Sequence, residues 1–496
     1  MKYIKYLLVG ILLNLASCSG FLDEDPATFF SPENYYTKPE HAQAAVNAAY
    51  SYTLNYYTAS GTYAGTPHFM LEFLTGQAIT KVGQNQSNHQ FIGLSYNNDN
   101  EYIRNWWQIS YYGVHASNLV LKYVPGISMN EGDKNRNLAE AHFLRAFYYF
   151  NLVRLFGEAP LLIEPIEDLG SAQDAEKASQ EEIYELIVED LKAAENTASL
   201  PDTDRTGRVS KLAVKSLLAK VYLTMAGYPL QKNGYYKLAA DKAKEVIESN
   251  QYALFDEYGK LHNKAFENMG EHIFMAQFYP EIQQHLNHAY TLPFQMDISI
   301  VADEFGALLP EEEFYNSYAA GDKRVEEQQF FYTEFTPIAG KNKGKKVTFG
   351  YPAIFKHFDF DAENTARQAL NYPILRYADV LLIYAEAQNE VGRTALAEQS
   401  LQEIRERAGF VGENFNGLSQ SEFREAVWRE RNWELCYENQ TWFDMLRTRK
   451  AFNVKTKAFD DFVGHINLSS GKALQANNLL LPVPERETNI NPDLKN

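Results

Sequence analysis

The sequence contains two groups of side chains whose types and spacing could bind a metal ion. His285 and His288 are three residues apart in QHLNHAY, so one turn of a helix would present both imidazoles. Asp359, Asp361 and Glu363 alternate in DFDAEN as calcium ligands can, but the turn glycine and the distal glutamate of an EF-hand are missing. No third ligand for the histidine pair is apparent in the sequence. We therefore predict no metal site and expect the two histidines on a polar surface.

The common spacings for catalysis and phosphate binding are absent from the sequence. It has no G-x-S-x-G, H-E-x-x-H, P-loop or G-x-G-x-x-G, and the segment GKNKGKK misses the P-loop spacing and its Ser or Thr. The chain has 64 Asp and Glu residues, and sequence alone does not give the separation that a glycosidase pair requires. The sequence therefore favours binding over catalysis and predicts no cofactor. A surface hydrolase is the alternative from the enzyme class.

Cys18 is one of only two cysteines, and its surroundings suggest covalent modification. Lys2 and Lys5 precede an apolar run of residues 6–15, which is too short to span a membrane and is typical of a signal peptide. The following LASC resembles the lipobox of bacterial lipoproteins, in which the cysteine is lipidated and becomes the mature N-terminus. The alternative is an ordinary signal peptide with an incidental cysteine. We predict that Cys18 is a lipid anchor, because the rest of the sequence has no second long apolar run.

The composition excludes several classes of partner. The net charge of −18 argues against nucleic acid and against attraction to anionic lipid. The other cysteine, Cys436 in WELCYE, is predicted to be a small buried side chain, so no disulfide is expected. The 33 tyrosines can fill a core, but tyrosine also suits wet binding surfaces because its ring is apolar and its hydroxyl polar.

Helical signals dominate after the first 39 residues. Ser179 and Glu182 form a capping-box pattern, and Ser210 is a plausible N-cap for a helix that Gly227 ends. Pairs of amphipathic segments about 34 residues long are typical of tetratricopeptide-like hairpins. The expected pairs are 41–54 with 102–124, 137–157 with 180–194, 210–250, and 377–409. The predicted fold is thus mainly α, with irregular tetratricopeptide-like hairpins forming a scaffold; the alternative is a generic helical bundle.

Two long irregular stretches interrupt the scaffold, and the second of them forms a loop-rich subdomain. Long irregular segments within a compact domain are usually functional or disordered, and the many aromatic residues here favour order. The predicted organisation is a signal peptide at 1–17, a lipidated tether at 18–39, a helical scaffold at 40–262 with a loop insertion at 55–100, a loop-rich subdomain at 263–372, a helical hairpin at 373–409 and a C-terminal part at 410–496.

These two stretches also contain the candidate binding residues. A sugar ring has flat C–H faces and hydroxyl edges, so a site for it needs aromatic planes and amide or charged side chains beside them. Asparagines and glutamines accompany the aromatic residues in both stretches. We expect at least two of the aromatic side chains to line a shallow groove. The candidates are Tyr56, Tyr57, Tyr63, His68, Tyr279, Tyr290 and Phe294.

Six motifs in order then resemble one known family nearly end to end. They are FLDEDPATFFSPENYYTKPEHAQAAVNAAY, EAHFLRAFYYFNLVRLFGEAPLL, TGRVSKLAVKSLLAKVYL, NYPILRYADVLLIYAEAQNEVG, AVWRERNWELCYENQTWFDMLR and LLLPVPERETNINPDL. Together they resemble the SusD/RagB family of outer-membrane lipoproteins of Bacteroidetes. The matching charged residues, among them Arg376, Asp379, Arg431 and Glu434, are interpreted as buried ion pairs of the fold and not as a binding site.

The resemblance implies a function as well as a fold. It implies a non-catalytic nutrient-binding protein, anchored by lipid in the outer membrane and facing the cell exterior. It also implies that the protein captures a glycan and delivers it to a SusC-like TonB-dependent transporter. Peptide or other nutrient binding in the same kind of complex is an alternative within the family, and a pure interaction scaffold is an alternative from another class.

Overall fold

The computed structural model describes residues 35–58, 63–166, 175–300, 303–365, 367–392 and 394–495. Cys18, the predicted signal peptide and most of the predicted tether therefore lie outside the described residues. The described end of the tether contacts the helical part, because Tyr36 stacks on Tyr123 with ring centroids 4.9 Å apart. Within the described ranges, no helix combines the length and apolar character needed to cross a membrane.

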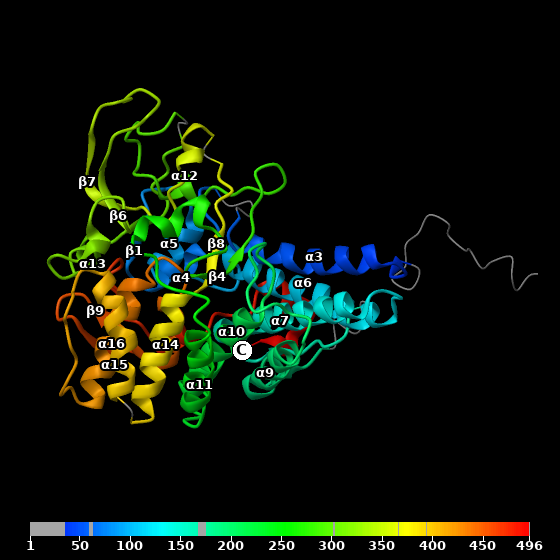
Figure 1. Ribbon diagram of the computed structural model, residues 1–496. Coiled ribbons are helices and arrows are strands. Elements are labelled where there is room, and N and C mark those ends of the chain that lie inside the picture. Colours follow the sequence, from blue (N-terminus) through cyan, green and yellow to red (C-terminus); the bar gives the residue numbers. More distant parts are fainter. Residues whose placement is uncertain are drawn as a thin grey trace, which may run out of the picture.

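The scaffold consists of antiparallel helix pairs that pack side by side, as the sequence predicts (Figure 1). Consecutive pairs also contact one another: α7 packs on α6, α10 on α9, and α14 on α11. The pairs are α3 (Pro39–Asn55) with α6 (Glu101–Tyr123), α7 (Glu131–Phe156) with α9 (Gln180–Glu195), α10 (Lys211–Ala226) with α11 (Tyr235–Glu248), and α14 (Tyr377–Glu390) with α15 (Thr394–Arg407). Two further helices, α16 (Gln420–Glu434) and α17 (Thr441–Thr448), follow.

Local signals fix the ends of several helices. Ser179 and Glu182 form the predicted capping box of α9, and Ser210 accepts a hydrogen bond from the Ala213 amide at the start of α10. Gly157, with φ of +74°, follows α7 directly and turns the chain in a conformation that favours glycine.

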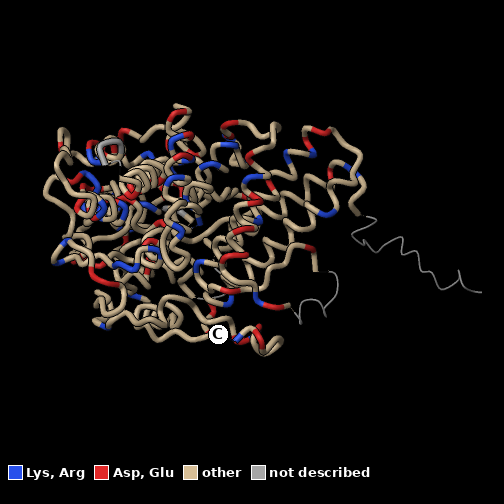
Figure 2. Tube along the Cα trace, turned by 90° about the horizontal axis from the view of Figure 1, so that it is seen from below, with Lys and Arg blue, Asp and Glu red and all other residues tan. Residues whose placement is uncertain are grey.

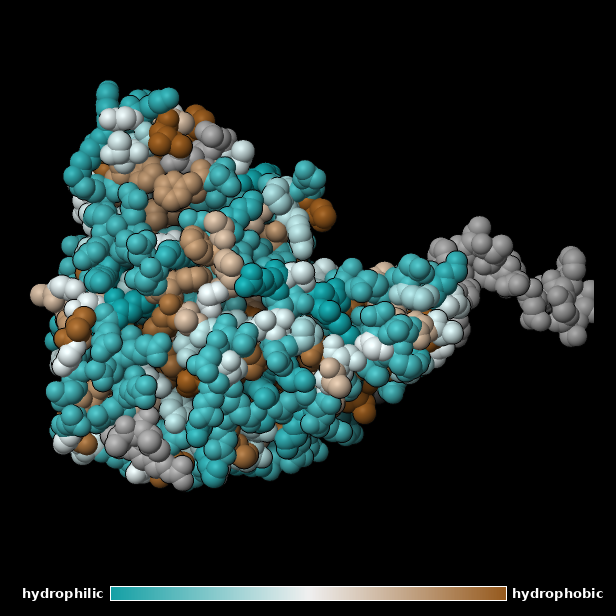
Figure 3. All heavy atoms as spheres, in the orientation of Figure 1, coloured by the Kyte–Doolittle hydropathy of each residue, from teal (hydrophilic) through white to brown (hydrophobic). Residues whose placement is uncertain are grey.

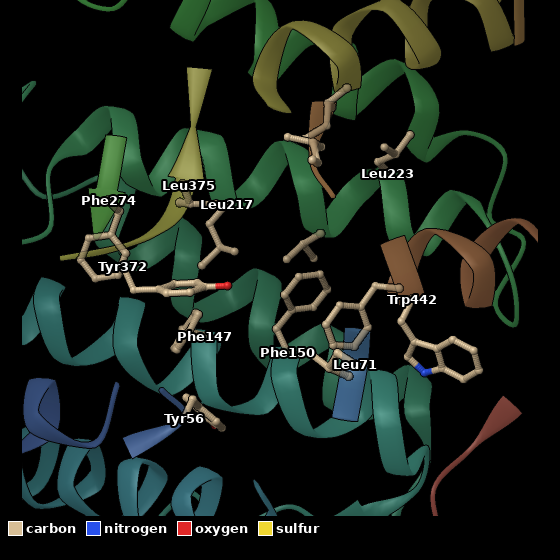
Figure 4. Close-up of a cluster of buried hydrophobic side chains, with 14 of the residues drawn as sticks. Tyr56, Leu71, Phe147, Phe150, Leu217, Leu223, Phe274, Tyr372, Leu375 and Trp442 are labelled. Atoms are coloured by element: carbon tan, nitrogen blue, oxygen red, sulfur yellow. The ribbon is translucent and has the colours of Figure 1, made fainter. Parts of the chain in front are cut away.

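Aromatic side chains fill the space between the helices and the strands that cross them (Figure 4). Tyr56, Phe147 and Phe150 lie among the first helices, while Tyr372 and Leu375 enter the same cluster from a strand. The core therefore joins residues that are more than 300 positions apart in the sequence, and scaffold and loops share it.

The loop-rich part forms the upper lobe of Figure 1, around β6, β7 and α12. It has its own small core, which includes Tyr332, Phe335, Phe349 and Phe358. All strand pairs in the described residues are antiparallel, and the β4–β8 and β6–β7 ladders contain register irregularities. The pairs are β1 (Ala78–Ile79) with β5 (Leu309–Pro310), β2 (Ala159–Pro160) with β3 (Lys177–Ala178), β4 (His272–Ala276) with β8 (Tyr372–Arg376), β6 (Phe331–Phe335) with β7 (Val347–Ile354), and β9 (Lys450–Asn453) with β10 (Ala458–Asp461).

The two stretches expected to be loops contain more regular structure than the sequence suggests. Short elements are hard to recognise from sequence, because they span too few residues to show a period. The first stretch folds into α4 (Phe69–Leu74), β1 and α5 (Gln86–Ile92), and the second includes α12 (Asn287–Thr291) and α13 (Glu312–Tyr315). A last short helix, α18 (Glu485–Ile490), lies near the C-terminus.

The charged residues interpreted as fold determinants do form buried ion pairs. Arg376 Nε donates to Glu438 Oε2 at 2.8 Å, and the guanidinium also pairs with Glu271 and Glu434. Burial by itself would raise the pKa of Glu438, but Arg376 and Lys356 outweigh that effect and lower the pKa to about 2. Red and blue residues are intermixed over the molecule in Figure 2, with no separation into an acidic and a basic face.

Gly113 of α6 lies directly against the ring of Tyr148 of α7 and provides a test of the packing. A Cβ atom built on Gly113 would lie 2.3 Å from the ring of Tyr148, and the Tyr148 hydroxyl donates to the Ala49 carbonyl of α3 at 2.6 Å. We expect Gly113→Ala to lower the free energy of unfolding by about 1–3 kcal/mol through overpacking, although helix propensity alone would favour alanine by about 1 kcal/mol. Urea denaturation measures the change.

The control for this prediction is Gly126→Ala, since no atom lies within 4 Å of a Cβ built there. Equal stability of the Gly113→Ala variant and the parent protein would show that the two helices do not approach as closely as described.

Candidate functional site

Four of the seven candidate binding residues are buried and present no ring face to solvent. Tyr56, Tyr57, His68 and Tyr290 are all less than 10% exposed. Tyr56 donates or accepts a 2.8 Å hydrogen bond with Ser110, and Tyr57 stacks on Tyr372 with ring centroids 3.9 Å apart. Packing within the protein, and not ligand contact, therefore explains the positions of these side chains.

The other three candidates lie at or near the surface of the two insertions. Tyr63 is 57% exposed, Tyr279 is 52% exposed, and Phe294 is half-buried. Tyr63 packs its ring edge on Phe305 at 5.6 Å, and Phe305 in turn contacts the buried Tyr290 at 5.4 Å. The exposed ring of Tyr63 is thus supported by a chain of aromatic contacts that reaches the core.

Tyr279 occupies a separate turn that is anchored to the end of α3. Its amide donates to the carbonyl of Gln283 at 3.1 Å, and the Gln283 side chain donates to Asn55 Oδ1 at 3.4 Å. Ile282, at the tip of the same turn, is 83% exposed. An aromatic ring and an isoleucine are therefore held out to solvent beside amide groups, which suits contact with the C–H face and hydroxyl edge of a sugar.

Other exposed apolar side chains of the loop-rich part escaped the sequence interpretation. Ile300 is 51% exposed and Phe360 is 53% exposed. Tan and brown atoms gather over the upper lobe in Figure 3, which contains these segments. Exposed apolar residues grouped on one part of a surface indicate an interaction site. Sequence alone does not distinguish an exposed isoleucine from a core residue.

The expected surface position of His285 and His288 is wrong, because both side chains are buried. His285 Nε2 lies 2.8 Å from the Leu370 carbonyl, and His288 Nδ1 accepts from the Asp359 amide at 3.1 Å. The segment that carries Asp359 and Leu370 folds over α12 and covers the pair, which sequence spacing does not reveal. In the described residues, no three His, Cys, Asp or Glu side chains are grouped as a metal site; the side chain of Glu363 lies outside them.

The buried imidazole of His288 leads to a prediction about acid sensitivity. Burial lowers the pKa of His288 to about 3, below the value of about 6.5 in an unfolded chain. Between these values the unfolded chain binds the proton and the folded protein does not, so stability present above about pH 6.5 is lost as the pH falls. At pH 5 the expected loss from this residue is about 2 kcal/mol.

The variant His288→Asn retains an acceptor for the Asp359 amide but does not titrate. We expect the fall in unfolding free energy between pH 7 and pH 5 to be smaller in this variant by about 2 kcal/mol, whatever its stability at pH 7. The matched control is His89→Asn at an exposed histidine. Parallel pH profiles for His288→Asn and the parent protein would contradict the buried, neutral imidazole.

These features define a class of protein: a large α-helical scaffold whose loops expose aromatic and apolar side chains, as expected of a binding protein. Comparison with known families identifies the class further. The family described as "SusD family" matches residues 198–496, and the one described as "Starch-binding associating with outer membrane" matches residues 29–223. The chain belongs to the SusD family.

Individual relatives agree with this assignment. The chain is 26% identical over 533 aligned residues to SusD-like protein P2 of Formosa agariphila, covering 100% of this chain and 99% of the relative. A crystal structure of a SusD superfamily protein from Parabacteroides distasonis is 37% identical, covers 92% of this chain and 98% of its own, and superimposes with a TM-score of 0.87. Surface glycan-binding protein A of Bacteroides thetaiotaomicron, solved with laminarihexaose, is 21% identical, with coverages of 91% and 98% and a TM-score of 0.69, and it shows the same fold.

Proposed function

We propose that this protein is a non-catalytic cell-surface protein that captures an oligo- or polysaccharide at the loop-rich lobe. The observation that carries the proposal is the pair of exposed tyrosines, Tyr63 and Tyr279, each held out by packed or hydrogen-bonded loops of a SusD-family fold. The family description as starch-binding and the laminarihexaose complex of a relative support a glycan as the ligand. The captured glycan passes to a SusC-like TonB-dependent transporter of the outer membrane.

A panel of neutral oligosaccharides tests the proposal. The protein is produced from residue 19 onward, and laminari-, malto- and xylo-oligosaccharides are screened for binding by calorimetry. A peptide digest is screened in parallel to test for peptide binding. We expect at least one glycan to bind, and binding to be insensitive to chelators and to moderate salt, because stacking and neutral hydrogen bonds carry it. If only peptides bind, the nutrient that this protein captures is a peptide and the glycan part of the proposal is wrong.

Attachment to the membrane through Cys18 is a second part of the proposal. Two or more acyl chains suffice for stable anchoring where a single chain does not, and a lipoprotein cysteine carries that number. Cys18→Ala is expected to move the protein from the membrane fraction to the soluble fraction in a strain that lacks the transporter. Fractionation together with labelling by a lipid precursor measures this, and a variant that remains in the outer membrane on its own would show that something else anchors it.

A further inference from the structure

A large cavity in the described part of the chain lies away from the loop-rich lobe. Its volume is about 860 Å³, which falls within the range of small-molecule sites. It lies where the C-terminal segment, residues 476–495, crosses the ends of α7, α9, α10 and α17, and the C label in Figure 2 marks this end of the chain. None of the seven candidate binding residues lines it.

The charge of this cavity is unlike that of the whole chain. The chain carries a net charge of −18, yet the described residues that line the cavity include four basic side chains and no acidic one. One of them, Arg447, already pairs with Glu386 and Asp444. The others are Arg154, Arg449 and Lys495.

Arg154 is held rigidly but lacks an acidic partner. Its guanidinium lies between the rings of Phe150 and Phe443, 3.8 and 3.5 Å from their centroids. Nε donates to the Phe150 carbonyl and Nη2 to Asn151 Oδ1, both at 2.9 Å. No carboxylate of the described chain pairs with it, and the half-buried side chain lines the cavity. Burial lowers the pKa of Arg154 to about 10, because the nearby Asp444 and tyrosines offset the loss of hydration only in part.

Arg449 also lines the cavity and likewise lacks an acidic partner. It ends α17 in a left-handed conformation, with φ of +56°, and its guanidinium lies over the ring of Tyr228 at 5.3 Å. Its side chain has no ion pair with any described residue, and burial lowers its pKa. Two guanidinium groups that are oriented by aromatic rings and lack counter-ions form a receptor for an oxyanion, because their free N–H groups can bind carboxylate or sulfate oxygens in pairs.

Amide side chains complete the lining. Asn98 and Gln180 are half-buried at the cavity wall, and neither side-chain amide hydrogen-bonds to another residue in the described part of the chain. Each offers both a donor and an acceptor, which matches sugar hydroxyls. Oxyanion receptors beside free amides suit a sugar that carries an acidic group.

We propose that this cavity is a second binding site, which takes an acidic sugar and recognises its carboxylate or sulfate group through Arg154 and Arg449. The site is separate from the loop-rich lobe, so its absence would leave the proposed capture of neutral glycans intact, and the reverse also holds. Since charge carries the interaction, binding here weakens as salt is raised, in contrast to the neutral ligands of the lobe.

The test uses glucuronic acid, glucose 6-sulfate and glucose as probes, with the chain from residue 19 onward and saturation-transfer NMR to measure affinity. We expect one or both acidic sugars to bind at least about tenfold more tightly than glucose, with the preferred acid identifying carboxylate or sulfate as the group recognised. Arg154→Gln and Arg449→Gln should each remove most of this preference. Arg449 lies at the cavity wall without an ion pair, so we expect Arg449→Gln to fold. This variant therefore still tests the proposal if Arg154→Gln does not fold.

The matched control is Arg429→Gln, at a half-buried arginine that stacks on Trp433 outside the cavity. This variant should bind the acidic probes as the parent protein does. The proposal is overturned if neither acid binds better than glucose, or if the folded Arg154 and Arg449 variants keep the preference unchanged.

Discussion

Replacing Arg376 with methionine is expected to lower the free energy of unfolding by about 3–5 kcal/mol, because it removes one positive charge from a buried cluster of three carboxylates and leaves their negative charge incompletely compensated. Single domains commonly unfold with a free energy of only about 5–15 kcal/mol, so this loss is a large part of the total stability. Arg376 is 2% exposed and pairs with Glu271, Glu434 and Glu438. Denaturant titration followed by circular dichroism measures the loss.

The position of these partners explains the size of the effect. Glu271 precedes β4, while Glu434 ends α16, so one guanidinium connects a strand of the loop-rich part to a scaffold helix. Glu438 also binds Lys356, whose ammonium donates to two further carbonyl groups, those of Glu434 and Cys436. Removing Arg376 therefore disturbs a network and not a single pair.

Two further variants make this prediction specific. Lys237→Met breaks an exposed ion pair with Asp241 and should cost less than about 1 kcal/mol. The double variant Arg376→Met with Glu438→Gln removes one negative charge together with the positive one and should recover part of the loss. An Arg376→Met protein that unfolds at the same denaturant concentration as the parent would contradict the role assigned to the network.

The scaffold could be predicted from sequence because its signals are local. The helices depend on signals that involve residues close together in the sequence, namely amphipathic periodicity, the capping box at Ser179 and the N-cap at Ser210. The helix pairs follow from these helices. The burial of Cys436 was predictable for the same reason. The family resemblance predicted that charged residues such as Arg376 form buried ion pairs. It did not identify the partners of Arg376, because these lie more than 50 residues away in the sequence.

The exposure of the candidate binding residues was not predictable from the sequence. Tyr57 stacks on Tyr372 and is buried, while Tyr63, only six residues away, is 57% exposed. That difference depends on which distant segment folds over each ring. The basic cavity was missed entirely, since Arg154, Arg449 and Lys495 belong to three segments that only the tertiary fold brings together.

Truncating the exposed tyrosines is expected to have the largest effect on ligand binding. A ring stacked on a sugar loses its contact area when it becomes alanine, and stacking contacts of this kind are worth about 1 kcal/mol or more each. We expect Tyr63→Ala and Tyr279→Ala each to weaken binding of the glycan found in the panel by about tenfold. Stability should change little, because both side chains are more than half exposed.

Tyr112 provides the matched control. It is 52% exposed, as Tyr279 is, but it lies on α6 in the scaffold and outside both insertions. Tyr112→Ala should bind the glycan as the parent protein does. If both loop variants fold and bind at parental strength, the loop-rich lobe is not where the glycan is held.

The central claim is that the protein binds a glycan and does not cleave it. One calorimetric titration, followed by recovery of the sugar, tests both binding and the absence of cleavage. The glycan selected by the panel is titrated into the protein, and the sugar is then recovered and its chain length determined by chromatography. The account predicts a saturable heat of binding and a recovered sugar identical in length to the one added. Absence of binding to every glycan of the panel, or recovery of shortened chains, would contradict it.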